Sequence, residues 1–520
     1  MLKSIAVSLF IIIATCVTAQ TNPQKYAAII TASDLKKHLS IVAGPEMEGR
    51  ETASEGQRKA ATYIETYFRS LNLLPGNAGS YQQKYSLMED SMVFSTIKIG
   101  KQEYVYGKDF IMYARTNKNR QIESGSIIFG GYGISDSLYN DYDQLNIEGA
   151  IVVLATGLPS SKNIRTINGN PSLSAWSLTR KVQEAYNKGA AGVFVISRGM
   201  VTVDSNMAKV QRLTGPYLPH KNDTGAVNNY AFISHDLFGK IFKPDIAKSL
   251  LQKLDSSSTF SLQDHISVKE QAAFNYTSVS YEKGTSSNVI AVIEGSDKKD
   301  EYVFLSAHYD HLGIRKGGVI YYGADDDGSG TVSVLEMATA FAKAKADGNG
   351  PRRTMVFMTV SGEEEGLWGS EYYTDHPLFP LEKTSVDLNT DMVGRIDPKR
   401  TYGDSTNYVY VIGDNKLSSD LKPISEMINN KYSHLELDYK YNDPKDLERI
   451  YYRSDHYNFA RKGVPIIFYF NGTHADYHRP TDTVDKINFN LMEKRDHLIF
   501  YTAWEMANRD QMLKRDIPLQ

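Results

Sequence analysis

The alternation of apolar and polar residues differs among three parts of this 520-residue chain. Between residues 32 and 73, apolar residues recur every three or four positions, which predicts helices. From about 120 to 270, short apolar runs such as GSIIFGGYGI, GAIVVLAT and GAAGVFVIS predict strands, with one helical stretch at RKVQEAYNKG. After residue 286, continuous apolar runs alternate with amphipathic stretches, which is typical of strands that alternate with helices.

The third part predicts the main architecture. The predicted strands are NVIAVIEG, EYVFLSAHYD, RTMVFMTVS, TSVDLNTDMVG, NYVYVIG and VPIIFYF. SGTVSVLEMATAFAKAKA predicts a long helix between two of them. Strands that are apolar on both faces need a helical layer on each side, so we predict an α/β three-layer sandwich with a mixed, mostly parallel central sheet. In such sheets, ligands bind beyond the carboxyl ends of the strands.

Length and composition limit the possible classes of protein. A chain of 520 residues is too long for one ordinary hydrophobic core, so we expect two domains or one domain with a large insertion. The composition is that of a globular protein, with 41% hydrophobic and 23% charged residues. The net charge of −3 gives no sign of a nucleic-acid partner or of an acidic membrane surface as a partner.

Residues 1–19, MLKSIAVSLFIIIATCVTA, predict a signal peptide, with a positive Lys3, a short apolar stretch and small residues at the end. We therefore expect export to a bacterial periplasm or secretion, without stable membrane insertion after the signal is removed. A membrane anchor and a lipid anchor at Cys16 are the alternatives. Because Cys16 is the only cysteine, a metal site in the mature chain must use His, Asp and Glu.

Acidic residues and histidines follow the predicted strands at five places. They are His308 and Asp310 in SAHYDHLG, the aspartates of GADDDGSG, the glutamates of GEEEG, Asp391 in NTDMVG, and His478 in ADYHRPTDT. Each place alone has an ordinary explanation, such as a buried histidine, a helix cap or a solvated charged run. Together in one cleft, so many carboxylates would repel one another unless divalent cations were bound. Histidine and carboxylate ligands without thiolates suit zinc in a catalytic site.

In this order, the five segments resemble the motifs of the di-zinc aminopeptidase family, the family-28 metallopeptidases. The motifs are H-x-D, G-A-x-D-x-x-S-G, E-E-x-G-L-x-G-S, N-x-D-M-V-G and Y-H-x-P-x-D, and EMEGRETASEGQRKAATYI also resembles that family. The middle part of the chain resembles a mainly-β protease-associated domain in FGGYGI, YNDYDQLNIEGAIVVLATG and AYNKGAAGVFVIS. The expected organisation is a signal peptide at 1–19, a peptidase domain in two parts at 20–119 and 273–520, and a protease-associated insertion at 120–272.

The resemblance implies a set of metal ligands for two zinc ions per chain. These ligands are His308, Asp326, Glu364, Asp391 and His478. Asp326 would bridge the two ions, which would lie about 3.5–4 Å apart. His308 and Asp391 would hold one ion, whereas Glu364 and His478 would hold the other.

The resemblance also implies three catalytic residues. Asp310 would orient the ligand histidine that precedes it from the second shell. Glu363 would be the general base and would later deliver the proton to the leaving amine. Tyr477 would donate a hydrogen bond to the oxyanion, with a buried structural tyrosine as the alternative. A cis peptide bond between Asp326 and Asp327 is implied as well, and Glu365 has neither role.

The implied activity is the release of N-terminal residues from peptides by a hydroxide that bridges two zinc ions. One alternative is carboxypeptidase-type or dipeptidase cleavage, with Arg453 or Arg479 as a clamp for a carboxylate. Glutaminyl cyclase activity and an inactive binding homologue are further alternatives. In YRSDHYNFARKG, which also resembles the family, we expect Ser454 to cap a helix that has Asp455 in its first turn. The sequence specifies neither the side-chain preference nor the oligomeric state.

Overall fold

The computed structural model divides the chain into two compact units. Unit 1 comprises the chain before Ser86 together with Thr285–Gln520, and unit 2 is Ser86–Gly284. The described residues are 22–112, 120–137, 139–160, 166–167, 170–174, 176–200, 202–203, 208, 213–219 and 229–519. The predicted signal peptide at 1–19 lies outside them. Among the described residues, no helix is long and apolar enough to cross a membrane.

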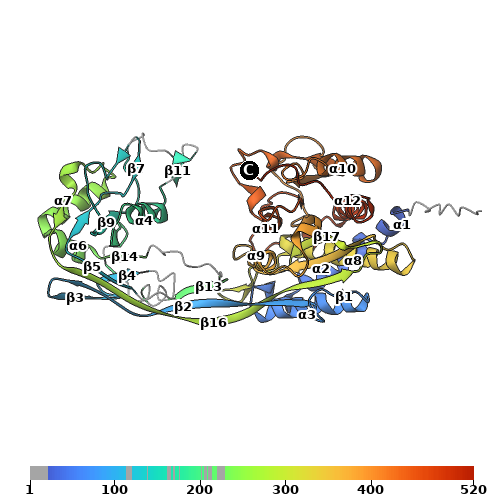
Figure 1. Cartoon of the computed structure of the whole chain (residues 1–520), viewed down its shortest axis with the longest axis horizontal. Helices are drawn as coiled ribbons and strands as arrows, with labels where there is room; N and C mark the ends of the chain where they lie inside the picture. The colour runs from blue at the N-terminus through green and yellow to red at the C-terminus, as the bar shows by residue number, and fades with distance from the viewer. Residues whose placement is uncertain are drawn as a thin grey trace, which may run out of the picture. The chain divides into compact units, whose positions relative to one another are not determined.

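Two long strands carry the chain from one unit to the other. β2 (Gln82–Ile99) leaves unit 1 and enters unit 2, and β16 (Ala272–Ile293) returns the chain to unit 1 (Figure 1). The insertion predicted at 120–272 lies within unit 2, which begins earlier and ends later in the sequence. The polar residues within both strands account for this difference, because they interrupt the apolar runs by which a strand is recognised.

Unit 1 contains the predicted central sheet. Its strand order is β16-β20-β17-β21-β24-β22-β23. The bounds are β17 (Lys298–His308), β20 (Arg353–Val360), β21 (Thr384–Thr390), β22 (Tyr408–Ile412), β23 (Glu436–Asp438) and β24 (Ile466–Phe470). β20, β17, β21 and β24 are parallel, whereas β16 runs antiparallel to β20, and β22 runs antiparallel to β24 and parallel to β23. The predicted α/β fold with a mixed sheet is thus confirmed.

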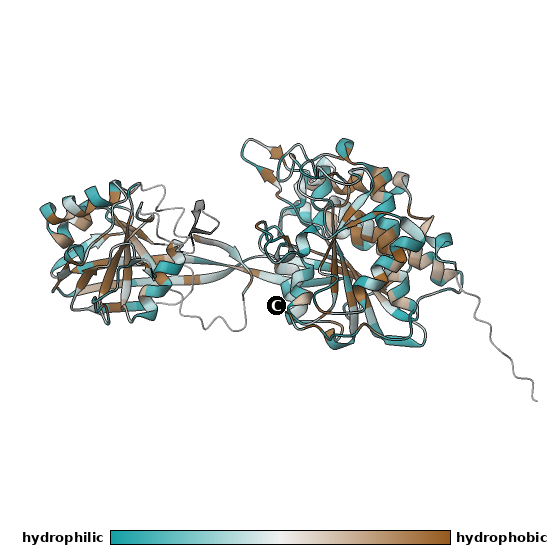
Figure 2. Ribbon diagram, turned by 90° about the horizontal axis from the view of Figure 1, so that it is seen from above, coloured by the Kyte–Doolittle hydropathy of each residue, from teal (hydrophilic) through white to brown (hydrophobic). Residues whose placement is uncertain are grey.

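A layer of helices covers each face of this sheet. On one face lie α1 (Gln24–Ala27), α2 (Ala32–Val42), α3 (Glu55–Ser70), α8 (Gly330–Ala346), α10 (Leu421–Ile428) and α12 (Phe489–Asn508). On the other lie α9 (Trp368–Asp375) and α11 (His456–Ala460). Alternate strand residues point to the two layers: Leu305 belongs to the first core and Phe304 to the second. The hydrophobic colour in Figure 2 accordingly concentrates on the central strands.

The order of strands creates a crevice at the end of β17. The connection from β17 to β20 runs through α8 on one face, and the connection from β20 to β21 runs through α9 on the opposite face. β17 lies between β20 and β21, so the two connections diverge on either side of it. At such a switch point the carboxyl end of the strand is left uncovered, and α/β proteins bind ligands there.

Unit 2 has a sheet of its own. Its described strands follow the order β15-β6-β9-β12-β14-β4. The bounds are β4 (Phe110–Met112), β6 (Ile127–Phe129), β9 (Ile151–Ala155), β12 (Gly192–Ile196), β14 (Tyr230–Ile233) and β15 (Ser267–Val268). The helices are α4 (Leu178–Asn187), α6 (His235–Phe242) and α7 (Pro244–Asp255), and α4 confirms the helix predicted at RKVQEAYNKG. An aromatic core centred on Phe129, Phe194 and Phe274 stabilises the unit.

A buried carboxyl group in the central sheet links stability to pH. Asp387 of β21 is fully buried and accepts a hydrogen bond from Ser306 through Oδ1. Its Oδ2 has no hydrogen-bond partner among the residues that the structure describes. Burial raises the pKa of Asp387 to about 8, and the nearby Asp455 contributes to the rise. The folded state therefore keeps a proton on Asp387 at pH 7, where the unfolded chain has lost it.

We expect Asp387→Asn to flatten the pH dependence of unfolding. Between about pH 4 and pH 8, folding of the native chain takes up this proton, so its free energy of unfolding falls as the pH rises. The neutral variant should gain about 2 kcal/mol relative to the native chain between pH 6 and pH 8. Urea unfolding at several pH values measures the gain, with the exposed Asp300→Asn as the control. Parallel pH profiles for native chain and Asp387→Asn would contradict the prediction.

Candidate active site

The side chains predicted from the strand ends come together at the carboxyl edge of the parallel strands. His308 is the last residue of β17, and Asp391 directly follows β21. Glu363 and Glu364 follow β20, and His478 follows β24 in the chain. The segment Ala324–Ser329, which leads into α8, adds Asp326. The strand topology therefore brings residues up to 170 positions apart into one cluster.

Asp326 lies between two groups of predicted ligands. Its Oδ1 is 3.3 Å from His308 Nε2, which is also 3.7 Å from Asp391 Oδ1. Its Oδ2 is 3.1 Å from His478 Nε2, which is 3.0 Å from Glu364 Oε2. The two carboxylate oxygens of Asp326 thus face different histidines, and this side chain is placed to bridge two cations.

The atoms that face one another in this cluster are without ordinary partners. Within the described part of the chain, His308 Nε2, His478 Nε2, Asp326 Oδ2 and Glu364 Oε1 are buried and form no hydrogen bond. Unpaired polar atoms in a protein interior are costly, so they occur where an ion or a ligand completes the site. Imidazole and carboxylate donors at these separations fit divalent cations such as zinc.

Asp326 and Asp327 are adjacent but serve different purposes. Asp327 Oδ1 accepts the backbone N–H groups of Gly330 and Met392, and its Oδ2 accepts the N–H of His308. These bonds occupy both oxygens of Asp327 and tie three segments of the site together. Asp326 keeps Oδ2 free, so it is the better candidate for a ligand. The peptide bond between the two residues is cis.

Asp310 fixes the ring of His308. His308 Nδ1 lies 3.2 Å from the backbone oxygen of Asp310 and 3.5 Å from its Oδ1. Because a carbonyl oxygen can only accept, Nδ1 carries a proton, and Nε2 is the nitrogen that faces the cluster and would bind a cation. Asp310 is itself held by hydrogen bonds from Thr52 and from the backbone N–H of Glu363.

The side chains of the three glutamates in the GEEEG segment point in different directions. Gly362 has a φ of +76°, and a Cβ atom there would lie 2.9 Å from Trp368 Cβ, so the turn requires glycine. The side chains of Glu363 and Glu364 are 12% and 5% exposed and point into the cluster, whereas Glu365 is exposed. Glu363 Oε2 is 3.8 Å from His308 Nε2. The turn thus directs two adjacent carboxylates inward and one outward.

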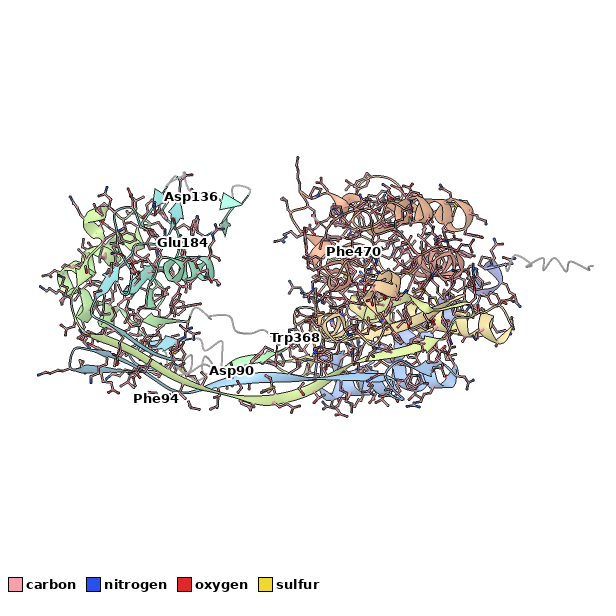
Figure 3. The ribbon with its side chains drawn as sticks, in the orientation of Figure 1. Asp90, Phe94, Asp136, Glu184, Trp368 and Phe470 are labelled. Carbon is pink, nitrogen blue, oxygen red and sulfur yellow. The ribbon has the colours of Figure 1, made fainter. Side chains whose placement is uncertain are left out.

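Tyr477 belongs to a pocket beside the cluster. Its ring stacks on His478 with centroids 3.8 Å apart, and its hydroxyl accepts a hydrogen bond from Arg453 at 3.1 Å. The pocket is lined by Asp326, Glu363, Asp391, Met392, Ile450, Arg453, Phe468, Phe470, Thr473 and Tyr477. Phe470, labelled in Figure 3, ends β24 and contributes to the apolar wall of this pocket.

Burial and neighbouring charges shift the pKa values of His308, Glu363 and His478. Burial alone would lower the pKa of His308, but the carboxylates of Glu363 and Asp391 raise it well above its ordinary value. Burial raises the pKa of Glu363 well above its ordinary value, and Asp391 adds to the rise. Burial opposes the charge of His478, yet the neighbouring carboxylates of Asp326 and Glu364 raise its pKa to about 10. Such mutual perturbation is a property of functional sites.

Two residues of the cluster were not predicted from the sequence. His311 lies in the predicted SAHYDHLG segment, and its Nδ1 is 2.7 Å from Glu364 Oε1. Arg50 comes from the GRE segment near the start of unit 1 and is fully buried. The sequence held a signal for both, because each lies within a stretch that resembles the family, but their side-chain directions depend on the tertiary fold.

One local prediction was wrong. Neither Ser454 nor Asp455 caps α11 through its side chain, although Asp455 occupies the N-cap position. Asp455 is fully buried, and its Oδ1 accepts a hydrogen bond from the hydroxyl of Ser370. Ser454 accepts a hydrogen bond from Asn389. Both side chains point into a buried polar network between β21, α9 and α11 instead of toward the helix end.

Arg50 fastens two of the segments that carry the cluster. Its guanidinium donates hydrogen bonds of 2.7–2.9 Å to four backbone oxygens, those of Val42, Tyr309, Tyr322 and Gly323. Tyr309 lies between His308 and Asp310, and Gly323 begins the GADDDGSG segment. Burial lowers the pKa of Arg50 to about 10, so it remains a cation at neutral pH beside the carboxylates.

Comparisons with known proteins agree with this geometry. Residues 288–503 match the family model described as Peptidase family M28. A Trichophyton verrucosum protein named "Probable leucine aminopeptidase" is 30% identical over 225 residues, which are 42% of this chain and 57% of that relative. A Leptosphaeria maculans protein named "Probable zinc metalloprotease" is 36% identical over 115 residues, which are 21% of this chain and 24% of that relative. This chain therefore spans less than two thirds of either relative.

A solved structure shares the fold. The aminopeptidase from Aneurinibacillus sp. strain AM-1 aligns with a TM-score of 0.51 at 18% sequence identity, and the alignment covers 96% of this chain and 100% of that one. At this level of identity, the likeness concerns the arrangement of helices and strands.

We expect Arg50→Met to destabilise unit 1 by about 3 kcal/mol. The substitution leaves four buried carbonyl oxygens without a donor and removes a buried cation beside several carboxylates. Urea unfolding of the metal-free full chain measures the loss. Arg58→Met, which removes an exposed arginine on α3, is the control and should change the free energy by less than about 0.5 kcal/mol. Equal stability of the two variants would contradict the role given to Arg50.

Proposed function

We propose, from the match of residues 288–503 to the model of Peptidase family M28, that the chain is a zinc-dependent exopeptidase that releases N-terminal residues from peptides. One observation carries the proposal. Four buried donor atoms, on His308, Asp326, Glu364 and His478, face one another without hydrogen bonds in the described part of the chain. The hard oxygen and imidazole donors of this set suit zinc.

The residues fit a pair of cations. His308 and Asp391 would hold one, and Glu364 and His478 would hold the other, with Asp326 shared between them. Two bound zinc ions would lower the pKa of a shared water and polarise the scissile carbonyl group. The proposal of two ions is supported by the two separate oxygens of Asp326, each of which faces a different histidine.

Glu363 is placed to move the proton. Its carboxylate approaches His308 from the pocket side and is not needed to complete either pair of ligands. It would accept a proton from the attacking water and deliver it to the nitrogen of the leaving amine. Its backbone N–H is held by Asp310 Oδ1, so the same residue that orients His308 also fixes the position of the base.

Tyr477 and Arg453 are placed to bind the substrate. Burial raises the pKa of the Tyr477 hydroxyl far above its ordinary value, so the group stays protonated and is able to donate to a developing oxyanion. Arg453 donates to the same hydroxyl and keeps it at the mouth of the pocket. The apolar wall formed by Met392, Ile450 and Phe468 would accept the first side chain of the peptide.

The names of the relatives support release from the amino terminus. One relative is named as a leucine aminopeptidase and another as a zinc metalloprotease. The position of Arg453 in the pocket keeps one alternative open, because a guanidinium is able to clamp the terminal carboxylate of a carboxypeptidase or dipeptidase substrate. A substrate panel separates these two functions.

Two further proposals concern the remainder of the chain. The composition of residues 1–19 supports export to the periplasm or secretion. The separate sheet and core of unit 2 support the assignment of its middle part as a protease-associated domain. Its helices and strands add no residue to the candidate ligands.

We expect Glu363→Gln to lower turnover alone and Glu364→Gln to lower both zinc binding and turnover. Loss of the base should lower kcat by about 10²–10⁴-fold while two zinc ions remain bound. Loss of the ligand should reduce the bound zinc as well as the turnover. Metal content by atomic emission, together with hydrolysis of an aminoacyl chromogenic amide, measures both. Glu365→Gln is the matched control and should change neither. Equal zinc content in the Glu363 and Glu364 variants would show that base and ligand have been exchanged.

The substrate panel gives a second prediction. Peptides and chromogenic amides with a free amino terminus should be hydrolysed, and their N-acetylated forms should not. A chelator should abolish the activity, and added zinc should restore it. Cleavage of N-acetylated peptides that keep a free carboxyl terminus would instead favour the carboxypeptidase alternative, and Arg453→Met should then raise KM. Activity that persists in excess chelator would overturn the proposal of a zinc peptidase.

A further inference from the structure

His311 is a buried histidine beside the predicted ligands that the motif comparison leaves without a role. It follows Asp310 in the loop after β17 and is 1% exposed. Its Nδ1 lies 2.7 Å from Glu364 Oε1 and 3.9 Å from Asp326 Oδ2. A buried imidazole usually hydrogen-bonds through at least one nitrogen. Here both ring nitrogens are without a hydrogen bond to any residue that the structure describes.

The short distance to Glu364 is not a hydrogen bond. Glu364 Oε1 is itself without a hydrogen bond among the described residues, so His311 and Glu364 approach each other without the alignment that a shared proton requires. Two ligands of one cation show this arrangement, because each lies about 2 Å from the ion and the two are then about 3 Å apart. The geometry thus favours a common ion over a shared proton.

The two oxygens of Glu364 each face a different imidazole. Oε1 faces His311 Nδ1 at 2.7 Å, and Oε2 faces His478 Nε2 at 3.0 Å. The two rings have centroids 5.9 Å apart and planes inclined by 71°. His311 and His478 thus approach opposite oxygens of Glu364, and the ligand atoms of His311, Asp326 and Glu364 lie within 4.8 Å of one another, a separation that a shared ion requires.

The chain fixes the ring of His311 in this position. Gly323 has a φ of +56°, and a Cβ atom there would lie 2.4 Å from His311 Cγ, so only glycine lets the ring occupy this place. The backbone N–H of His311 donates to the backbone oxygen of Arg50 at 3.3 Å. His311 is therefore held between the Gly323 segment and the backbone of Arg50.

We propose that His311 Nδ1 is a zinc ligand that completes the site of Glu364, His478 and Asp326. This inference depends on the proposed function and makes its two cation sites unequal. The first site has His308 and Asp391 beside the shared Asp326, whereas the second has His311, Glu364 and His478 beside it. A site with four protein ligands is filled, and a site with three keeps a position open. The His308 site then keeps the more open position for substrate, and the His311 site binds its ion more tightly.

The test measures zinc binding, without reference to turnover. Zinc alone is titrated into the metal-free full-length protein against a chromophoric chelator, for the native chain, His311→Ala and His311→Asn. Asparagine places an N–H near the position of Nδ1 and is able to hydrogen-bond to Glu364, but it is a poor zinc ligand. We expect two classes of site in the native chain and a loss of at least about tenfold in the affinity of the tighter class in both variants.

A matched control shows that the loss is local. His38 is another buried histidine of unit 1, and it contacts Tyr63 and Glu336 away from the cluster. His38→Asn should leave both zinc affinities within about twofold of the native values. Native affinity in His311→Asn would mean that His311 only hydrogen-bonds to Glu364, and it would overturn the inference. A native chain that binds no zinc would overturn the proposed function together with it.

A crystal structure of the zinc-loaded native protein decides the question even if the variants do not fold. Zinc within about 2.1 Å of His311 Nδ1 supports the inference. A separation of more than about 3 Å overturns it while leaving the proposed function intact.

Discussion

Repulsion among buried carboxylates is the constraint that the rest of unit 1 must satisfy. Parallel strands end at one edge of the sheet, and in this chain several of them end in acidic segments. The crevice beside β17 therefore collects Asp310, Asp326, Asp327, Glu363, Glu364 and Asp391 in an interior that solvates charge poorly. Each buried oxygen that finds neither a donor nor a cation lowers the stability of the fold. Arg50 supplies one fixed positive charge, and the geometry of the remaining oxygens indicates where others bind.

The chain meets this constraint by dividing its carboxylates into two sets. One set is satisfied by the protein: Asp327 accepts three backbone N–H groups, and Asp482 Oδ2 accepts those of Asp325 and Asp326. These bonds fix the backbone around the cluster. The other set, chiefly Asp326 Oδ2 and Glu364 Oε1, has no such donors within the described residues, and these are the oxygens for which cations are proposed. Adjacent residues of identical chemistry thus differ in function through the hydrogen bonds that the backbone offers them.

The sequence predicted the strands of unit 1 and the clustering of their polar ends, because continuous apolar runs and the acidic residues that follow them are local features. It could not predict the positions of His311 and Arg50, because their side chains reach the cluster only when distant segments come together in the fold. Ser454 and Asp455 look like a helix cap locally, yet burial turns both toward Asn389 and Ser370. The sequence also did not predict where unit 2 begins and ends. β2 and β16 belong to both units, and their mixed polar and apolar residues do not mark the boundary.

The GEEEG turn directs two adjacent glutamates toward different partners. Glu363 points toward His308 and the pocket, and the next residue, Glu364, points between His478 and His311. Because a turn rotates successive side chains to different sides, adjacent glutamates reach opposite ends of Asp326. A shift of one residue would place the proton carrier where a ligand is needed. Gly362 prevents such a shift, since its left-handed conformation and its contact with Trp368 fix the register of the turn. The roles proposed for Glu363 and Glu364 therefore depend on the glycine that precedes them as much as on the glutamates themselves.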